Sequence, residues 1–209
     1  MNLNDFLQLV LFILVLVLVF VLSGSGFSLH KLLEGFGTKP LVKYYIFESD
    51  LDPIFTNRVV EILNASKVND RYTLSRVTSK VDADMTIALA KRSELDSMHD
   101  DHKHYYPDGK QIRFSFTTMR SGKPEILIDD ENWLKGVNQS GLTLDEYQRY
   151  VIQHEFLHAL GFDHQTCEPG AESCPIMHQS TRGCPAGTKC GFEITEQDYK
   201  KRISGWRHF

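Results

Sequence analysis

Three histidines and a glutamate fall within eleven residues, HEFLHALGFDH, at positions 154 to 164. His154 and His158 are four residues apart, so in a helix of about 100° per residue they lie within about 40° of each other on one face. Their imidazoles can therefore converge on one metal ion. Gly161 comes one turn after His158, and glycine can adopt the left-handed conformation that ends a helix and turns the chain. That turn would bring His164 back as a third ligand.

Three histidine ligands leave the fourth position of a zinc ion open, which is typical of a catalytic rather than a structural site. Glu155 lies about 100° round the helix from His154, beside the metal but too far round to be a natural third ligand. This is the position of a general base for a metal-bound water. A short histidine pattern can also be an ordinary solvated helix face. Gly161 and His164, at their fixed spacing, disfavour that alternative.

HEFLHALGFDH matches HExxHxxGxxH, so the chain resembles the metzincin metallopeptidases, which also carry a methionine in a tight turn beneath the zinc. Cys174-Pro175-Ile176-Met177 resembles that Met-turn, although Met177 alone could be a core methionine. The segment FEITEQDYKKRISGW is similar to the closing helix of matrixins, and the cysteine-flanked turn is similar to uncharacterised bacterial metzincin-like domains. The resemblance implies an α/β, zincin-like fold with a mixed twisted sheet, one antiparallel rim strand, an active-site helix, a Met-turn and a C-terminal helix.

The hydrophobic pattern predicts the elements around this motif. Strands are expected at residues 42–47, 72–77, 85–90, 112–118 and 125–129, the third of them apolar enough to be buried on both faces. Helices are expected at residues 53–66, at residues 144–160 behind a Thr143–Glu146 capping box, and after Thr195. The resemblance to metzincins places residues 112–118 at the rim of the cleft, where a substrate could add a strand.

An apolar segment, Phe6–Leu22, contains a single polar residue, Gln8. Its 17 residues would span roughly 26 Å as a helix, against about 30 Å for a hydrocarbon core. A membrane anchor is favoured because MNLND lacks the positive charge that precedes the apolar run of a signal peptide. A signal peptide cleaved within Ser23–Gly26 is the alternative. The expected organisation is an anchor or signal segment at 1–22, a linker at 23–40 and a metzincin-like catalytic domain at 41–209.

All four cysteines, Cys167, Cys174, Cys184 and Cys190, fall within the last 43 residues. None forms a CxxC pair, which disfavours a structural zinc site. An even number of cysteines behind a hydrophobic leader favours disulfides in an oxidising compartment, and the local pairs Cys167–Cys174 and Cys184–Cys190 are favoured among three connectivities. A count of the lysines after the apolar segment would hold the domain in the cytosol. We weigh the cysteines more heavily and expect a single-pass membrane protein with its domain outside the cytosol, or a secreted one.

The resulting hypothesis is a zinc endopeptidase. Zinc on the three histidines lowers the pKa of a bound water, and Glu155 takes a proton as that water attacks a peptide carbonyl. The expected partners are a polypeptide substrate and, through residues 6–22, a membrane. The net charge of −4 and the lack of a basic stripe predict no nucleic-acid partner. A non-catalytic binding module with the same fold and a zinc hydrolase of a non-peptide substrate are the alternatives.

A second histidine-rich stretch, MHDDHKHYY, contains His99, His102 and His104 with two aspartates. A second, structural metal is conceivable there. A solvated loop is the favoured interpretation, because such tracts are compositional evidence only.

Overall fold

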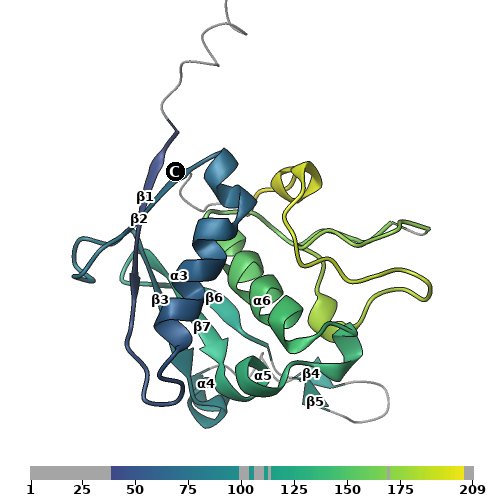
Figure 1. Cartoon of the computed structure of the whole chain (residues 1–209), viewed down its shortest axis with the longest axis horizontal. Helices are drawn as coiled ribbons and strands as arrows, with labels where there is room; N and C mark the ends of the chain where they lie inside the picture. Colours follow the sequence, from purple (N-terminus) through teal and green to yellow (C-terminus); the bar gives the residue numbers. More distant parts are fainter. Residues whose placement is uncertain (1–38, 99–103, 106–110, 113, 169, 205–209) are drawn as a thin grey trace, which may run out of the picture. The chain divides into compact units, whose positions relative to one another are not determined.

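A five-stranded mixed sheet, in the order β2-β1-β3-β7-β6, forms the framework of the fold (Figure 1). Strands β1, β2, β3 and β7 run parallel, and β6 pairs antiparallel with β7 at the sheet edge. Their bounds are β1 Leu41–Ile46, β2 Thr73–Arg76, β3 Met85–Ala90, β6 Phe116–Arg120 and β7 Lys123–Asp129. The predicted α/β class, with a mixed sheet and one antiparallel strand, is confirmed.

The computed structural model describes residues 39–98, 104–105, 111–112, 114–168 and 170–204. From Pro40 onward these residues belong to one compact unit. The predicted leader and all but the end of the predicted linker lie outside the described residues, so that division of the chain stays a prediction.

Within the described ranges, no helix is long and apolar enough to cross a membrane. This finding contradicts the predicted transmembrane, single-pass protein, and we correct that prediction together with the membrane partner and the membrane location that followed from it. The prediction depended on Phe6–Leu22 alone, and this segment lies outside the described residues.

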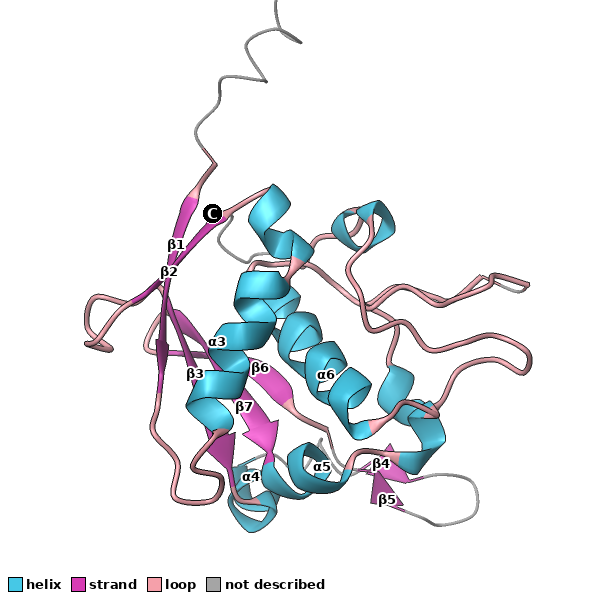
Figure 2. Ribbon diagram, in the orientation of Figure 1, coloured by secondary structure: helices cyan, strands magenta, loops and turns pink. Residues whose placement is uncertain are grey.

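Two helices, α3 (Phe55–Ala65) and α6 (Leu144–Ala159), lie side by side on one face of the sheet (Figure 2). The main core lies between them and the strands, where Val42, Ile87 and Ile126 are fully or almost fully buried. On the opposite face, Ala88 and Ala90 of β3 pack against a small cluster of Leu95, Phe116 and Leu127. Strand β3 therefore has apolar neighbours on both faces, although only one of its faces is fully buried.

The helix starts follow local capping chemistry. Thr143 Oγ1 accepts a hydrogen bond from Glu146 N, and Glu146 Oε2 accepts one from Thr143 N, which completes the predicted capping box at the start of α6. Helix α3 begins later than Pro53, because Asp52 Oδ1 accepts from Ile54 N and forms a turn before the helix. The second oxygen of Asp52 accepts from Trp133 Nε1 at 2.7 Å.

Two further elements differ from expectation. The predicted strand 112–118 is divided: Gln111–Ile112 is β5, which pairs antiparallel with β4 (His104–Tyr105), and β6 begins only at Phe116. The predicted last helix is a single 3₁₀ turn, η5 (Glu196–Tyr199). The short elements α4 (Arg92–Met98), α5 (Asp130–Lys135), η1 (Lys67–Asp70), η3 (Asn138–Ser140) and η4 (Ser180–Arg182) complete the described structure.

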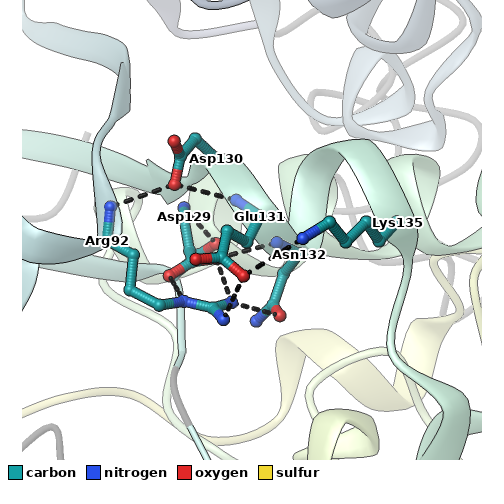
Figure 3. A network of polar contacts seen from close by, with 7 residues as sticks. Arg92, Asp129, Asp130, Glu131, Asn132 and Lys135 are labelled. Carbon is teal, nitrogen blue, oxygen red and sulfur yellow. Dashed lines mark hydrogen bonds and ion pairs between the residues drawn. The ribbon is translucent and has the colours of Figure 1, made fainter.

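An ion pair between Arg92 and the buried Asp129 holds the carboxyl end of β7 to α4 (Figure 3). Arg92 donates to both carboxylate oxygens of Asp129, at 2.9 and 2.6 Å, and Asp129 is 0% exposed. Asp129 Oδ1 also accepts from Asn132 N and so caps α5, while the Arg92 guanidinium reaches Glu131 as well. Removing one partner from such a pair leaves an uncompensated buried charge, which costs about 3–5 kcal/mol.

We therefore expect Arg92→Ala to lower the free energy of unfolding by about 3 kcal/mol or more, measured by urea denaturation. The matched control is Lys67→Ala, because Lys67 pairs with Glu193 at the surface and both side chains are 60% exposed. This control should cost less than about 1 kcal/mol. Equal losses for the two variants would show that the buried pair does not stabilise the end of β7.

Candidate metal centre

Helix α6 and the turn that follows it bring the three histidines of the motif together. His158 Nε2 lies 3.2 Å from His154 Nε2 and 3.0 Å from His164 Nε2. A tetrahedral zinc ion with bonds of about 2.0–2.1 Å holds its nitrogen ligands about 3.3 Å apart. Both distances are close to this value, and all three nitrogens lie within 4.8 Å of one another, so the group could hold one ion.

Gly161 makes the turn that returns His164 to the site. Its φ of 87° lies in the left-handed region, which costs a residue with a side chain about 1–2 kcal/mol. Gly161 N donates to His158 O, and Phe162 N donates to Leu157 O. These two bonds form a Schellman motif, which ends α6 directly after its second histidine.

Backbone carbonyls fix the orientation of both helical histidines. His154 Nδ1 lies 2.7 Å from Ile176 O, and His158 Nδ1 lies 2.8 Å from Phe162 O. A carbonyl can only accept, so each Nδ1 carries the proton and each Nε2 keeps its lone pair. The two Nε2 atoms are thereby available to a metal.

The electrostatic environment keeps these imidazoles neutral, as metal ligands must be. Burial lowers the pKa of His154 well below its usual range, and the neighbouring His158 and His164 add to the effect. Burial also lowers the pKa of His158. Burial, together with the charge of His158, lowers the pKa of His164 to about 4.

Glu155 is buried beside the histidines. Thr117 Oγ1, on the edge strand β6, lies 2.9 Å from Glu155 Oε2 and 2.9 Å from Glu155 O. Burial raises the pKa of the Glu155 carboxyl to about 8, and the Thr117 hydrogen bond opposes part of this rise. A divalent cation on the adjacent nitrogens would favour the ionised form and lower this pKa.

Thr117 was missed by the sequence reasoning as a site residue. It was expected only as part of the rim strand, and it is 38 residues from Glu155 along the chain. No local pattern links the two, because their contact depends on how β6 packs against α6.

Met177 lies in a turn below the site and is completely buried. Its N–H donates to Asp198 Oδ1 at 2.9 Å, and its carbonyl accepts from Gln165 N at 3.0 Å. Asp198 Oδ2 accepts from Thr195 N, so one carboxylate caps η5 and holds the turn. The sequence predicted only a helix after Thr195, and the contact of Asp198 with Met177 was missed.

A cleft of about 360 Å³ opens over the three histidines and Glu155. Its lining comes mainly from the segment leading into the edge strand β6 and from α6. Apart from the histidines and the glutamate, the cleft is lined by Phe114, Ser115, Phe116, Thr117, Tyr150, Val151, Gln179, Thr181 and Ile203. The three histidines and Glu155 therefore line a cleft that could admit a substrate.

The four cysteines and the second histidine-rich stretch were also singled out by the sequence. The structure contains the disulfides Cys167–Cys174 and Cys184–Cys190. His99 and His102 lie outside the described residues, and His104 belongs to β4.

We expect the protein with intact disulfides to bind one zinc ion at this site, and His158→Ala to weaken binding at least tenfold or so, since even loss of a supporting contact costs about 10–100-fold. Competition against a chromophoric chelator measures both affinities. His178→Ala, which removes a histidine outside this triad, is the control and should bind like the wild type. Equal affinities for the His158 variant and the wild type would contradict the assigned ligand set.

Two comparisons with known proteins bear on this site. Residues 49–201 match the family described as "Protein of unknown function (DUF3152)". Endoribonuclease YbeY of Nautilia profundicola (strain ATCC BAA-1463 / DSM 18972 / AmH) is 27% identical over 114 residues, which cover 54% of this chain and 78% of that protein.

The second comparison corrects our prediction of partners. That relative is an endoribonuclease by name, which contradicts the expectation of a polypeptide partner without nucleic acid. The first comparison assigns the family, because the match at residues 49–201 extends over well more than half of the chain: the chain belongs to the DUF3152 family of proteins of unknown function.

Proposed function

We propose that this chain is a metal-dependent hydrolase with its reaction centre at His154, His158 and His164. The observation that carries the proposal is the convergence of three Nε2 atoms, within 4.8 Å of one another, beside a buried carboxyl group at the base of a cleft. Zinc bound by three histidines keeps an open position and lowers the pKa of a water there toward about 7.

Glu155 is the proposed general base. In its ionised form it takes a proton from the attacking water and then gives that proton to the leaving group. Thr117 holds the carboxylate from the side of the edge strand, 2.9 Å from Oε2. The three histidines would hold the metal in their neutral form through Nε2. The carbonyls of Ile176 and Phe162 fix the rings of His154 and His158.

We also propose that the surroundings of the site are metzincin-like. The support is the glycine turn at Gly161, which ends α6 between the second and third histidines, and the buried Met177 in the turn whose Ile176 carbonyl orients His154. The edge strand β6, antiparallel to its neighbour, has the position expected of a rim strand.

The next question is which type of bond the proposed hydrolase cleaves. The metzincin resemblance implies peptide bonds, whereas the endoribonuclease relative points to the phosphodiester bonds of RNA. Arg182 supports a negatively charged substrate: its guanidinium lies 5.5 Å from the ring of Phe114, which lines the cleft. A peptide carbonyl and a phosphoryl group are both centres that an activated water attacks, so a substrate panel decides between them.

We expect Glu155→Gln to lower hydrolysis by about 10²–10⁴-fold while the zinc content stays at the wild-type value, because Glu155 is not a ligand. Wild type and variant are incubated with a mixed RNA pool and a mixed peptide library, and new ends are read by mass spectrometry. Glu94→Gln, an exposed carboxylate on α4, is the matched control and should cleave like the wild type. Cleavage that persists in the Glu155 variant, or a wild type that cleaves neither pool, would refute the proposed hydrolase.

Thr117→Val should lower kcat by about tenfold or more, because a hydrogen bond to a charged group contributes about 1.5–3 kcal/mol. In the wild type, the hydrogen bond from Thr117 favours the ionised form of Glu155. Removing this bond therefore raises the pKa of Glu155. The base must be ionised to act, and the acid limb of the pH–rate profile should therefore move to higher pH. Thr117→Ser keeps the hydroxyl, so its kcat and the pH of its acid limb should be close to those of the wild type. An unchanged profile in the valine variant would show that Thr117 does not act on Glu155.

A further inference from the structure

A second group of potential metal ligands lies beside the turn that carries Met177. One ligand atom from each of Cys174, His178 and Cys184 lies within 4.8 Å of the other two. Both sulfurs are engaged in disulfides, with Cys167 and Cys190, and a disulfide sulfur lacks the thiolate that binds zinc. Two disulfides that are separate along the chain thus meet at one imidazole.

Backbone contacts hold the Cys174 end of this group independently of the disulfides. Cys174 N donates to Lys189 O at 2.9 Å, and Lys189 N donates to Glu172 O. Gly191 approaches so closely that a Cβ at its position would lie 2.1 Å from Cys174 O. Only glycine permits this contact, which keeps the chain next to Cys190 against Cys174.

His178 is also held by the backbone. Its N–H donates to Pro175 O at 3.0 Å, which closes the turn, and its carbonyl accepts from Tyr150 OH at 3.1 Å. Tyr150 is buried on α6 and accepts from Ser180 N through the same hydroxyl. None of these bonds involves a sulfur, so reduction of the disulfides removes none of them directly. The third member, Cys184, has its Sγ 3.6 Å from Ser180 Oγ, next to the same turn.

We propose that reduction converts this group into a second zinc site, formed by Cys174, His178, Cys184 and one of the two released thiols, Cys167 or Cys190. Three thiolates and one imidazole are a common tetrahedral ligand set for structural zinc, and soft thiolates favour zinc over magnesium or calcium. The released thiols start next to the site, because each was bonded to one of its ligands.

The conversion needs a reductant, which we take to be a dithiol. Each disulfide gains two electrons and two protons from one dithiol, which becomes a disulfide itself. Binding of zinc then releases the protons of the three coordinating thiols to solvent. The reverse reaction, with a disulfide as oxidant, expels the ion.

The second site would share its backbone with the first. Residues 174–178 include Ile176, whose carbonyl orients His154, and Met177. An ion that replaces the two disulfides would therefore keep the turn beneath the histidines closed in a reducing compartment. The proposal does not depend on the hydrolase activity, because it concerns other ligands.

Zinc content measured by native mass spectrometry before and after treatment with a phosphine reductant tests the proposal. We expect one more zinc ion per chain in the reduced protein. With Co²⁺ in place of zinc, thiolate-to-metal absorption in the near ultraviolet should appear only after reduction. His178→Ala should weaken the added site at least tenfold or so, and His178→Cys should restore it. His164→Ala, a control, should lose the first ion and keep the gain on reduction.

The same zinc content before and after reduction would overturn the proposal. So would an equal gain in the wild type and the His178→Ala variant, because the thiols would then bind zinc without the assembled group. Circular dichroism of the reduced protein accompanies both measurements. A reduced chain that loses its helical signal and binds zinc regardless of His178 counts against the proposal as well.

Discussion

The proposed metal centre depends on the contact between His154 Nδ1 and the carbonyl of Ile176, 2.7 Å apart. This contact joins α6 to the turn that contains Ile176, and it also fixes the tautomer that leaves Nε2 free for a metal. His158 makes the equivalent contact with Phe162 O, one residue beyond the glycine turn. The chain segments around Ile176 and Phe162 must therefore be in place before the ligands can point at one ion. The capping box fixes the start of α6, the glycine turn positions Phe162, and the contact of Asp198 with Met177 N positions the turn that contains Ile176.

Burial of the Glu155 carboxyl lowers the stability of the folded protein when this group must ionise. Burial raises the pKa of its carboxyl from the ordinary value of 4.5 to about 8. The native protein thus holds the proton more tightly than the unfolded chain, so the stability from this group is fully present below about pH 4.5 and is lost as the pH rises through about 8. At neutral pH a metal on the adjacent histidines would offset that loss by stabilising the carboxylate. A buried acid with so little structural benefit fits a site that serves chemistry.

Features that depend on residues close together in the sequence were predicted correctly. The spacing of His154, His158 and Gly161 predicted a helical face with a turn after it, Thr143 with Glu146 predicted the start of α6, and short loops favoured the cysteine pairs that the structure contains. Contacts set by packing could not be predicted: Thr117 with Glu155, Arg92 with Asp129, and Asp198 with Met177 join residues 38, 37 and 21 positions apart. Strand β6 started late for a similar reason, since Ile112 pairs with β4 instead. The partner prediction was wrong because the zinc motif specifies an activated water but not the bond that the water attacks.

X-ray absorption spectroscopy at the zinc edge, on the protein with intact disulfides, tests the central claim most directly. The ion's first coordination shell should contain three imidazole nitrogens at about 2.0–2.1 Å and one oxygen, with no sulfur at about 2.3 Å. That result would establish an open three-histidine centre, to which a water or substrate has access. A shell that contains sulfur, or four protein ligands and no exchangeable oxygen, would contradict a catalytic centre at these histidines.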